Sequence, residues 1–357
     1  MAFALSVEKL TLNFKFPAGT SRGTLHQRDT WFLKLAESAN EKKFGIGEAS
    51  PIWGLSEELE SSFDAELKQV VDRFNSSSIT KVQQLSKVVD EIIAPNMPSV
   101  KFALETAVYD YLNGCQRIVF DNDFAKGKMK IPINGLIWMG DKVFMIKQIN
   151  QKMKSGFKCL KIKVGAMDFV TECEVLEYIR EQYFNKKIEL RLDANGAFSI
   201  EEAYKKLEIL SGFNLHSIEQ PIAPGHRNEL AELVKDSPVP IALDEELIGV
   251  HGLEKKMELL STVNPQYIIL KPSLLGGFKE TREWIELAEA QNIGWWITSA
   301  LESNIGLNAL AQFTAEFDPD IIHGLGTGEL YHNNIDSPLE INQGYLLANQ
   351  AKNWSVQ

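Results

Sequence analysis

The sequence predicts an α/β protein in which a β/α barrel follows an α+β domain. Two observations carry the barrel prediction. Eight short β-rich segments recur at a nearly constant interval, and segments with the composition of amphipathic helices lie between many of them. The first ~125 residues carry a different pattern, which predicts a separate α+β domain.

The eight β-rich segments lie 24 to 30 residues apart, counted from start to start, which is about the length of one strand plus one crossover helix. They begin at residues 131, 158, 188, 215, 239, 267, 294 and 321. Helical patterns are predicted at 168–184, 199–210, 227–235, 278–291 and 303–315. An open, doubly wound sheet also alternates strands and helices, so the repeat alone does not close a barrel. The barrel is favoured because eight units follow one another.

The first ~125 residues resemble an antiparallel meander followed by helices. Strands are expected within 5–16, 30–37 and 42–50, with turns at Pro17-Ala-Gly and Ser38-Ala-Asn. Helices are expected at roughly 57–75, 80–93 and 98–113. The tail after ~330 has no repeat of its own and is expected to return to this domain. The predicted domains are therefore 1–125 with about 330–357, and 126–329.

Composition narrows the class of protein. A chain of 357 residues with 44% hydrophobic residues can bury a large core, and a net charge of -11 disfavours nucleic acids and anionic membranes as partners. No signal peptide or membrane-spanning segment is recognisable. Cys115, Cys159 and Cys173 form no C-x-x-C pair, which is typical of reduced thiols in a cytoplasmic protein. The sequence predicts no oligomeric state.

Ionisable residues occur at the carboxyl ends of the predicted strands, where the active site of a β/α barrel lies. They are Lys161, Lys163, Asp193, Glu219, Asp244 and Lys271. Each alone has a structural explanation, such as the solvent face of an edge strand, a turn or the start of a helix. Together they converge on one mouth of the barrel, which predicts a site for an anionic small molecule.

Three carboxylates without a thiolate or a histidine cluster predict Mg²⁺, for which Mn²⁺ can substitute. The six histidines have no zinc-site spacing. A divalent cation stabilises the ene-diolate that forms when a proton next to a carboxylate is removed. A lysine can remove that proton only if its pKa falls well below ~10.4, which burial and a neighbouring cation promote. Lys161 is such a neighbour for Lys163, and Lys271 would face the substrate from the opposite side.

Five motifs, in their order and spacing, resemble the enolase superfamily: K-I-K at 161–163, D-A-N at 193–195, E-Q-P at 219–221, D-E at 244–245 and K-P-S-L-L-G-G at 271–277. The resemblance implies an enolase-like fold, a (β/α)7β modified TIM barrel with an α+β capping domain. Lysines on strands two and six are similar to those of the muconate-lactonising subgroup. The mandelate racemase-like subgroup has a histidine base near strand seven, where this chain has Thr298 and Ser299.

Within the subgroup, two segments resemble the o-succinylbenzoate synthase family of menaquinone biosynthesis: T-S-A-L-E-S-N-I-G-L at 298–307 and H-G-L-G-T-G at 323–328. The segment T-S-R-G-T-L at 20–25 resembles that family's substrate-covering loop, and G-I-G-E-A-S-P at 45–51 the start of its second capping loop. The resemblance implies syn elimination of water from 2-succinyl-6-hydroxy-2,4-cyclohexadiene-1-carboxylate, a small-molecule carboxylate.

The resemblance also implies residue roles. Lys163 would abstract the proton and then help hydroxide leave, Lys271 would stabilise the intermediate, and Lys161 would assist Lys163. The Mg²⁺ ligands would be Asp193, Glu219 and Asp244. The expected substrate-binding residues are Ser21, Arg22, Asn195, Ser299 and Glu302.

Other functions remain open on the sequence alone. N-acylamino acid racemases and dipeptide epimerases of the same superfamily use both lysines as bases. Dipeptide epimerases usually carry D-x-D on the last strand, whereas here that strand runs into Gly326-Thr-Gly-Glu329. Outside the superfamily, a Schiff-base aldolase would use one lysine and no metal. A non-catalytic binding barrel would tolerate loss of the acids, yet all of them are present.

Overall fold

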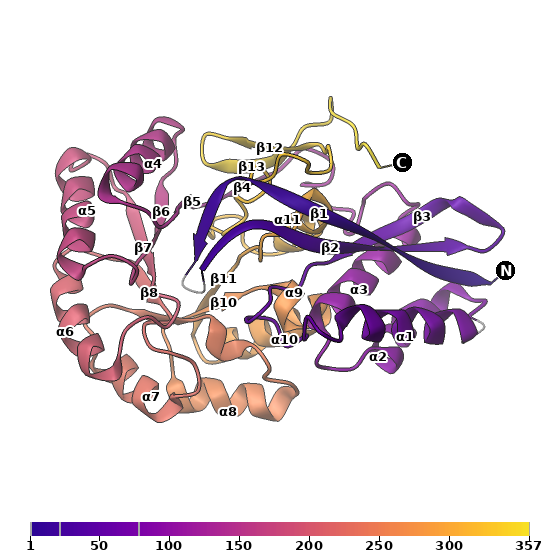
Figure 1. Cartoon of the computed structure of the whole chain (residues 1–357), viewed down its shortest axis with the longest axis horizontal. Helices are drawn as coiled ribbons and strands as arrows, with labels where there is room; N and C mark the ends of the chain where they lie inside the picture. The colour runs from indigo at the N-terminus through magenta and orange to yellow at the C-terminus, as the bar shows by residue number, and fades with distance from the viewer. Residues whose placement is uncertain (1, 21–22, 78, 357) are drawn as a thin grey trace.

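The computed structural model describes residues 2–20, 23–77 and 79–356. An antiparallel sheet precedes the barrel (Figure 1), with β1 (Phe3–Thr20), β2 (Gly23–Glu37) and β3 (Asn40–Ala49) paired in chain order. The predicted turn at Ser38 and Ala39 is confirmed. The predicted turn at Pro17-Ala-Gly is wrong, because β1 continues through it. The register of β1 on β2 shifts between Asn13 and Ala18, and such an irregularity admits a proline, which cannot donate to a ladder.

Three helices, α1 (Phe63–Ser76), α2 (Leu85–Ile92) and α3 (Pro98–Leu112), follow the sheet, with a 3₁₀ turn at Val82–Gln84. The first begins later than predicted, because residues before 63 form a loop. Helix α3 packs closely on β3, since a Cβ on Gly47 would lie 1.8 Å from the Ala103 carbonyl oxygen. Glycine at this position therefore sets the distance between the helix and the sheet.

The barrel contains seven parallel strands that are hydrogen-bonded in chain order. They are β5 (Gly135–Ile137), β6 (Cys159–Lys163), β7 (Glu189–Asp193), β8 (Ser217–Glu219), β9 (Ile241–Leu243), β10 (Tyr267–Leu270) and β11 (Gly294–Ile297). A helix follows each strand: α4 (Lys142–Lys154), α5 (Phe169–Gln182), α6 (Ile200–Ser211), α7 (Arg227–Asp236), α8 (Leu253–Val263), α10 (Gly277–Ala290) and α11 (Asn304–Thr314). Short elements, η2 (Glu245–Leu247) and α9 (Pro272–Leu275), follow β9 and β10. All five predicted barrel helices are confirmed.

The predicted eighth strand is reduced to two parallel bridges, His323 with Ile133 and Gly324 with Thr298. The His323 amide donates to the Pro132 carbonyl at 2.9 Å, and the Gly324 amide donates to Ile297 at 2.8 Å. This segment therefore joins the first and seventh strands and closes the ring. The (β/α)7β prediction is confirmed, with the last β unit shorter than the sequence pattern indicates.

The C-terminal tail contacts both parts of the molecule. Its hairpin, β12 (Leu339–Asn342) and β13 (Tyr345–Ala348), pairs with β4 (Lys130–Pro132), which the sequence pattern had merged with β5. Tyr331 bridges to Phe14 of β1, and Trp354 packs against an apolar cluster of the capping sheet. The tail thus contacts the capping sheet, and the domain division at 125 and 330 stays a prediction.

The capping sheet extends over the barrel mouth, as the arrangement of β1, β2 and the barrel strands in Figure 1 indicates. Leu25 of β2 lines the same cavity as Lys161 of β6, so the two parts share one site. Across the described ranges, none of the helices has the length and apolar character needed to cross a membrane.

Candidate active site

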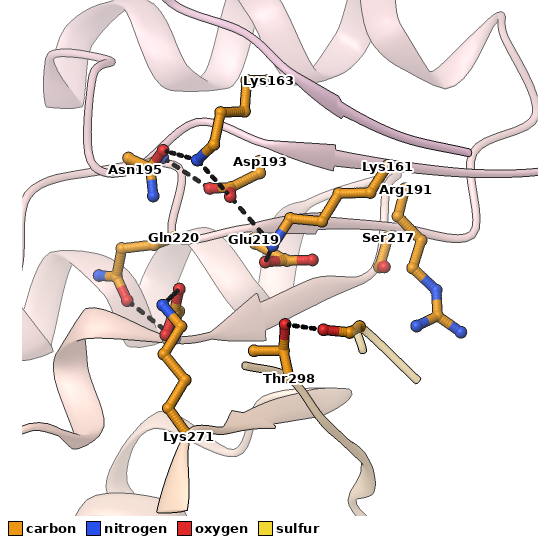
Figure 2. A network of polar contacts seen from close by, with 12 residues as sticks. Lys161, Lys163, Arg191, Asp193, Asn195, Ser217, Glu219, Gln220, Lys271 and Thr298 are labelled. Atoms are coloured by element: carbon orange, nitrogen blue, oxygen red, sulfur yellow. Dashed lines mark hydrogen bonds and ion pairs between the residues drawn. The ribbon is translucent and has the colours of Figure 1, made fainter. Parts of the chain in front are cut away.

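The six predicted strand-end residues meet in one group at the barrel mouth (Figure 2). Side chains two residues apart on a strand share a face, which brings Lys161 and Lys163 together on β6. The parallel register then aligns Lys163 with Asp193, and Asp193 with Glu219. Strand register therefore brings Lys163, Asp193 and Glu219 together.

Lysine ammonium groups lie between the carboxylates. Lys161 and Lys163 each contact Asp193 Oδ2 at 3.0 Å, and Lys161 also pairs with Glu219. Lys271 contacts Asp244 Oδ2 at 2.5 Å. Figure 2 shows Lys163 and Lys271 entering from opposite sides of the group. A molecule bound between them would meet one ammonium group on each side.

The carboxylates are almost fully removed from solvent, and their pKa values separate accordingly. Burial, together with the charges of Asp193 and Asp244, raises the pKa of Glu219 to about 7 despite its pairing with Lys161. Burial would also raise the pKa of Asp193, but Lys161, Lys163 and Lys271 together hold that pKa well below its usual range. The three lysines therefore stabilise Asp193 as an anion.

The same ion pairs act on the lysines. Burial alone would lower the pKa of Lys161, yet the charges of Asp193 and Glu219 raise it above its usual value. The pKa of Lys271 is likewise raised, because Asp244 and Glu245 outweigh burial. Pairing with carboxylates thus opposes the lowering of the lysine pKa that a catalytic base requires.

Asn195 holds Lys163 from a second direction. The Lys163 ammonium donates to Asn195 Oδ1 at 2.7 Å, and Asn195 Nδ2 donates to Glu245 Oε1 at 3.0 Å. Asn195 adopts a φ of 45°, a left-handed conformation that asparagine tolerates better than most residues. Its neighbour in the site, Gln220, accepts from the Asp244 amide at 3.2 Å and was not singled out from the sequence.

A cavity of about 170 Å³ lies above this charged group. Its polar floor includes Lys161, Lys163, Asp193, Asn195 and Lys271. Its apolar walls come from both domains and consist of Leu25, Ile52, Trp53, Leu55, Leu136, Trp138, Ala300 and Leu301. The hydroxyls of Ser299 and Thr327, 2.6 Å apart, also line it. The cavity therefore suits a molecule with a charged end and an apolar ring.

The predicted substrate-binding residues differ in whether they line the cavity. Asn195 and Ser299 line the cavity. Glu302 does not: it is fully buried, accepting from the Ser273 hydroxyl and from the Ala300 amide at 2.7 Å. The structure thus favours a role for Glu302 in holding the loop rather than in contacting substrate. Ser21 and Arg22 lie outside the described residues.

The residues that form the apolar walls of the cavity were not predicted from the sequence. Trp53 and Trp138 lie in loops, where an aromatic residue has no periodic pattern that marks it as cavity-lining. A larger hollow of about 460 Å³ lies between α2, α3 and α10, but the strand-end lysines and acids are not part of its lining. The smaller cavity is therefore the candidate active site.

The donor set fits a hard divalent cation. Asp193, Glu219 and Asp244 supply only carboxylate oxygens, and Glu219 Oε1 is buried without a hydrogen-bond partner among the described residues. The described carboxylates do not form a ready-made metal cluster, because the lysines lie between them. A cation could bind there once the ammonium groups withdraw, and the unpartnered oxygen of Glu219 is suited to become a ligand.

The fold and the site define a class: β/α-barrel enzymes in which buried carboxylates and opposed lysines face a cavity covered by a capping domain. Residues 145–354 match the enolase C-terminal domain-like family. The chain belongs to the enolase superfamily and, within it, to the o-succinylbenzoate synthases, which are carbon–oxygen lyases.

This assignment follows from similarity over almost the whole chain. The o-succinylbenzoate synthase of Desulfotalea psychrophila is 45% identical over 96% of this chain and 98% of that protein. The crystal structure of MenC from the same organism superposes with a TM-score of 0.85 at 41% identity, covering 97% of this chain and 100% of that one. A dipeptide epimerase from Enterococcus faecalis, solved with Mg and the dipeptide L-Leu-L-Tyr, has a TM-score of 0.83 over 100% and 99% of the two chains. Its identity is 19%, so it supports the fold alone.

Proposed function

We propose that this cytoplasmic enzyme acts on 2-succinyl-6-hydroxy-2,4-cyclohexadiene-1-carboxylate in menaquinone biosynthesis, using Mg²⁺ and the strand-end lysines to eliminate water. The observation that supports this most is the opposition of Lys163 and Lys271 across a cavity with a charged floor and apolar walls. The ring-bound carboxylate would lie toward the charged floor. The ring and the succinyl chain would lie against the walls.

Charge balance argues that a cation belongs in the site. The charged group at and beneath the floor contains the carboxylates of Asp193, Glu219, Asp244 and Glu245 and the ammonium groups of three lysines, Lys161, Lys163 and Lys271. When all are ionised the sum is 3 − 4, or one net negative charge, which repels a dianionic substrate. When bound, Mg²⁺ supplies two positive charges and stabilises the negative charge that develops on the substrate carboxylate. Asp193, Glu219 and Asp244 would hold it.

The elimination needs one group that first accepts and then returns a proton. Neutral Lys163 accepts the proton from ring carbon 1, and the C–H electron pair moves into the carboxylate to give an ene-diolate. The pair then returns to the ring, the bond between carbon 6 and the hydroxyl oxygen breaks, and the Lys163 ammonium protonates the departing hydroxide. The products are water and an aromatic ring. Both transfers occur on one face, which corresponds to syn geometry.

The remaining lysines act through their charge. The Lys271 ammonium faces the ene-diolate from the side opposite Lys163 and stabilises its negative charge. Lys161, deep between Asp193 and Glu219, places a second cation near Lys163.

Racemisation of N-acylamino acids is the alternative, and one observation favours it. Two lysines on opposite sides of a cavity are also what a two-base exchange at one carbon requires. The two reactions differ in what Lys271 must do. Elimination needs only its charge, whereas racemisation needs it to accept and return protons.

The purified protein with Mg²⁺ tests the proposal directly. The cyclohexadiene substrate should give an aromatic product, followed by its ultraviolet absorbance, and a panel of N-acylamino acids in D₂O should show no α-deuterium. Deuterium in both enantiomers of an N-acylamino acid, with no aromatic product, would contradict the proposed dehydratase activity and support a racemase activity instead.

A further inference from the structure

We propose that Arg28 is a positioning residue that fixes the spacing between two loops lining the active-site cavity. One loop belongs to the capping domain and the other follows the last full barrel strand. The proposal rests on the proposed function only in that its kinetic test uses that reaction. Its structural test does not require any activity.

Arg28 lies on β2 with only 8% of its surface exposed. Nη1 donates to the carbonyl oxygens of Ala300 and Leu301, at 2.6 and 2.8 Å. Nη2 donates to the carbonyl oxygens of Ser50 and Pro51, at 2.5 and 3.2 Å. One planar guanidinium therefore holds two consecutive carbonyls from each loop.

In both loops, residues that line the cavity lie at or next to the carbonyl groups that Arg28 binds. Ile52 and Trp53 follow Pro51 in the capping loop, and Ala300 and Leu301 are themselves wall residues of the barrel loop. The distance between the two walls therefore depends on the four hydrogen bonds of Arg28. The reacting groups are placed differently, by the register of the barrel strands.

The barrel loop requires a restraint at this point. Leu301 has a φ of 65°, a left-handed conformation that a residue with a β-carbon adopts only at an energetic cost. Its carbonyl oxygen accepts a second hydrogen bond, from the Tyr331 hydroxyl at 2.6 Å. Its side chain packs in the cluster that contains Trp138. Arg28 and Tyr331 together thus hold a conformation that Leu301 does not favour by itself.

A second capping residue anchors the other end of the barrel loop. Glu48 of β3 accepts from the Ser303 amide at 2.7 Å and from the Gly306 amide at 2.8 Å, at the start of α11. The Glu48 carboxylate also accepts from the hydroxyls of Thr30 and Ser50, at 2.9 and 2.5 Å. Residues 300–303 are therefore fixed to the capping sheet at both ends, and Arg28 is the member of this connection that binds the main-chain carbonyls of both loops.

Arginine suits this position better than lysine. The guanidinium presents five N–H donors in one plane, so it can serve four carbonyls at fixed angles. An ammonium group has three donors and cannot reproduce the parallel pairs. Arg28→Lys therefore keeps the charge while removing the geometry that spaces the loops.

The kinetic test compares Arg28→Lys with the wild type on the cyclohexadiene substrate. We expect KM to rise about tenfold and kcat to fall less than about threefold, because the walls shift while the strand-end groups stay in place. Tyr331→Phe, which removes one donor to Leu301, should raise KM by a smaller factor. If Arg28→Lys does not fold, the Tyr331→Phe result decides, and unchanged KM there overturns the proposal.

Arg117→Lys is the matched control. Arg117 is also a buried capping-domain arginine, with 5% exposed, but it pairs with Asp110 and donates to the Phe44 carbonyl at 3.1 Å, outside the cavity lining. It should lower the thermal unfolding midpoint and leave KM unchanged. An Arg28→Lys variant that loses stability with an unchanged KM, as the control does, would show that Arg28 is only structural.

Hydrogen exchange measured by mass spectrometry separates this proposal from the proposed function. Arg28→Lys should increase exchange in residues 50–55 and 299–306 together, and Arg117→Lys should not. Joint loosening of the two loops supports the positioning role even if the wild type proves inactive on the cyclohexadiene substrate. Loosening of one loop alone, or of neither, overturns it whatever the activity.

Discussion

Lys163 and Asn195 are joined by a hydrogen bond of 2.7 Å from the ammonium group to Asn195 Oδ1. Asn195 ends the D-A-N motif, which begins at the last residue of β7, whereas Lys163 is the last residue of β6. The amide oxygen is neutral, so it orients the lysine without adding a full negative charge beside it. A side chain that follows the neighbouring strand therefore orients the Lys163 ammonium group.

Asn195→Ala should lower kcat/KM. Without the amide oxygen the Lys163 ammonium group loses a hydrogen-bond acceptor that orients it, so steady-state kinetics should show a fall of about tenfold or more. Asn292→Ala, at an exposed position that also has a positive φ of 58°, is the control and should leave kcat/KM unchanged. Wild-type kcat/KM in Asn195→Ala would contradict an orienting role for Asn195.

The two opposed lysines should respond differently to substitution. Lys163→Ala should abolish elimination, because no proton acceptor remains on the reacting face. Lys271→Arg keeps a cation but is a very poor base, so elimination should persist at about a tenth to a hundredth of the wild-type rate. Single-turnover assays of both variants measure this. Loss of elimination in Lys271→Arg, combined with retained binding of the product, would contradict a purely electrostatic role.

Removal of the metal should stop turnover. Exhaustive EDTA treatment should abolish activity, and Mg²⁺ or Mn²⁺ should restore it, because lysines alone cannot stabilise the ene-diolate sufficiently.

Glu219→Gln should weaken Mg²⁺ binding at least about tenfold in calorimetric titration, since a carboxylate ligand is lost. Glu254→Gln, on an exposed face of α8, should bind Mg²⁺ as the wild type does. Full activity in EDTA would exclude the cation from the reaction.

Acid should destabilise the barrel through His323. Burial and the charge of Arg191 lower the pKa of His323 to about 3, from an ordinary value of 6.5. Between these values the unfolded state binds a proton that the folded state does not, so stability falls as the pH falls through this window. At pH 5 the loss is about 2 kcal/mol.

His323→Asn provides the measurement. Asparagine Oδ1 can replace the ring nitrogen that accepts from the Ile297 amide at 3.0 Å, but it does not titrate. Urea unfolding at pH 7.5 and pH 5 should show a smaller loss of stability in the variant. Equal losses in the two proteins would assign the acid sensitivity to other groups.

Strand register explains why so much of the site could be predicted. The period of two along a strand and the alignment of parallel neighbours place Lys163, Asp193 and Glu219 together once the strands are recognised. The (β/α)7β fold followed from the repeat and from motif resemblance. Even so, the sequence could not separate β4 from β5, because both read as one apolar run although they pair in different sheets.

The remaining features depend on contacts between distant segments. Arg28 meets Ala300 across 272 residues of sequence, and Glu48 meets Ser303 across 255. No periodicity in one sequence predicts such pairs. Glu302 was expected to bind substrate, but only the structure reveals that its oxygens accept hydrogen bonds from its own loop and from Ser273. The strand ends were thus predictable, and the cavity walls were not.

The parallel bridges at His323 and Gly324, which close the barrel, bear on the order in which parts of the chain fold. One of them joins Ile133 to His323, 190 residues later (323 − 133), whereas β7 to β9, which carry the three carboxylates, are neighbours in the chain. Contacts between distant segments form late, so we expect the acidic centre to assemble while the ring is still open. Burial of Asp193, Glu219 and Asp244, whose charge Lys161 and Lys163 neutralise only in part, then slows folding. Refolding followed by stopped-flow fluorescence should therefore accelerate with Mg²⁺, and Glu219→Gln should refold faster than the wild type when the cation is absent.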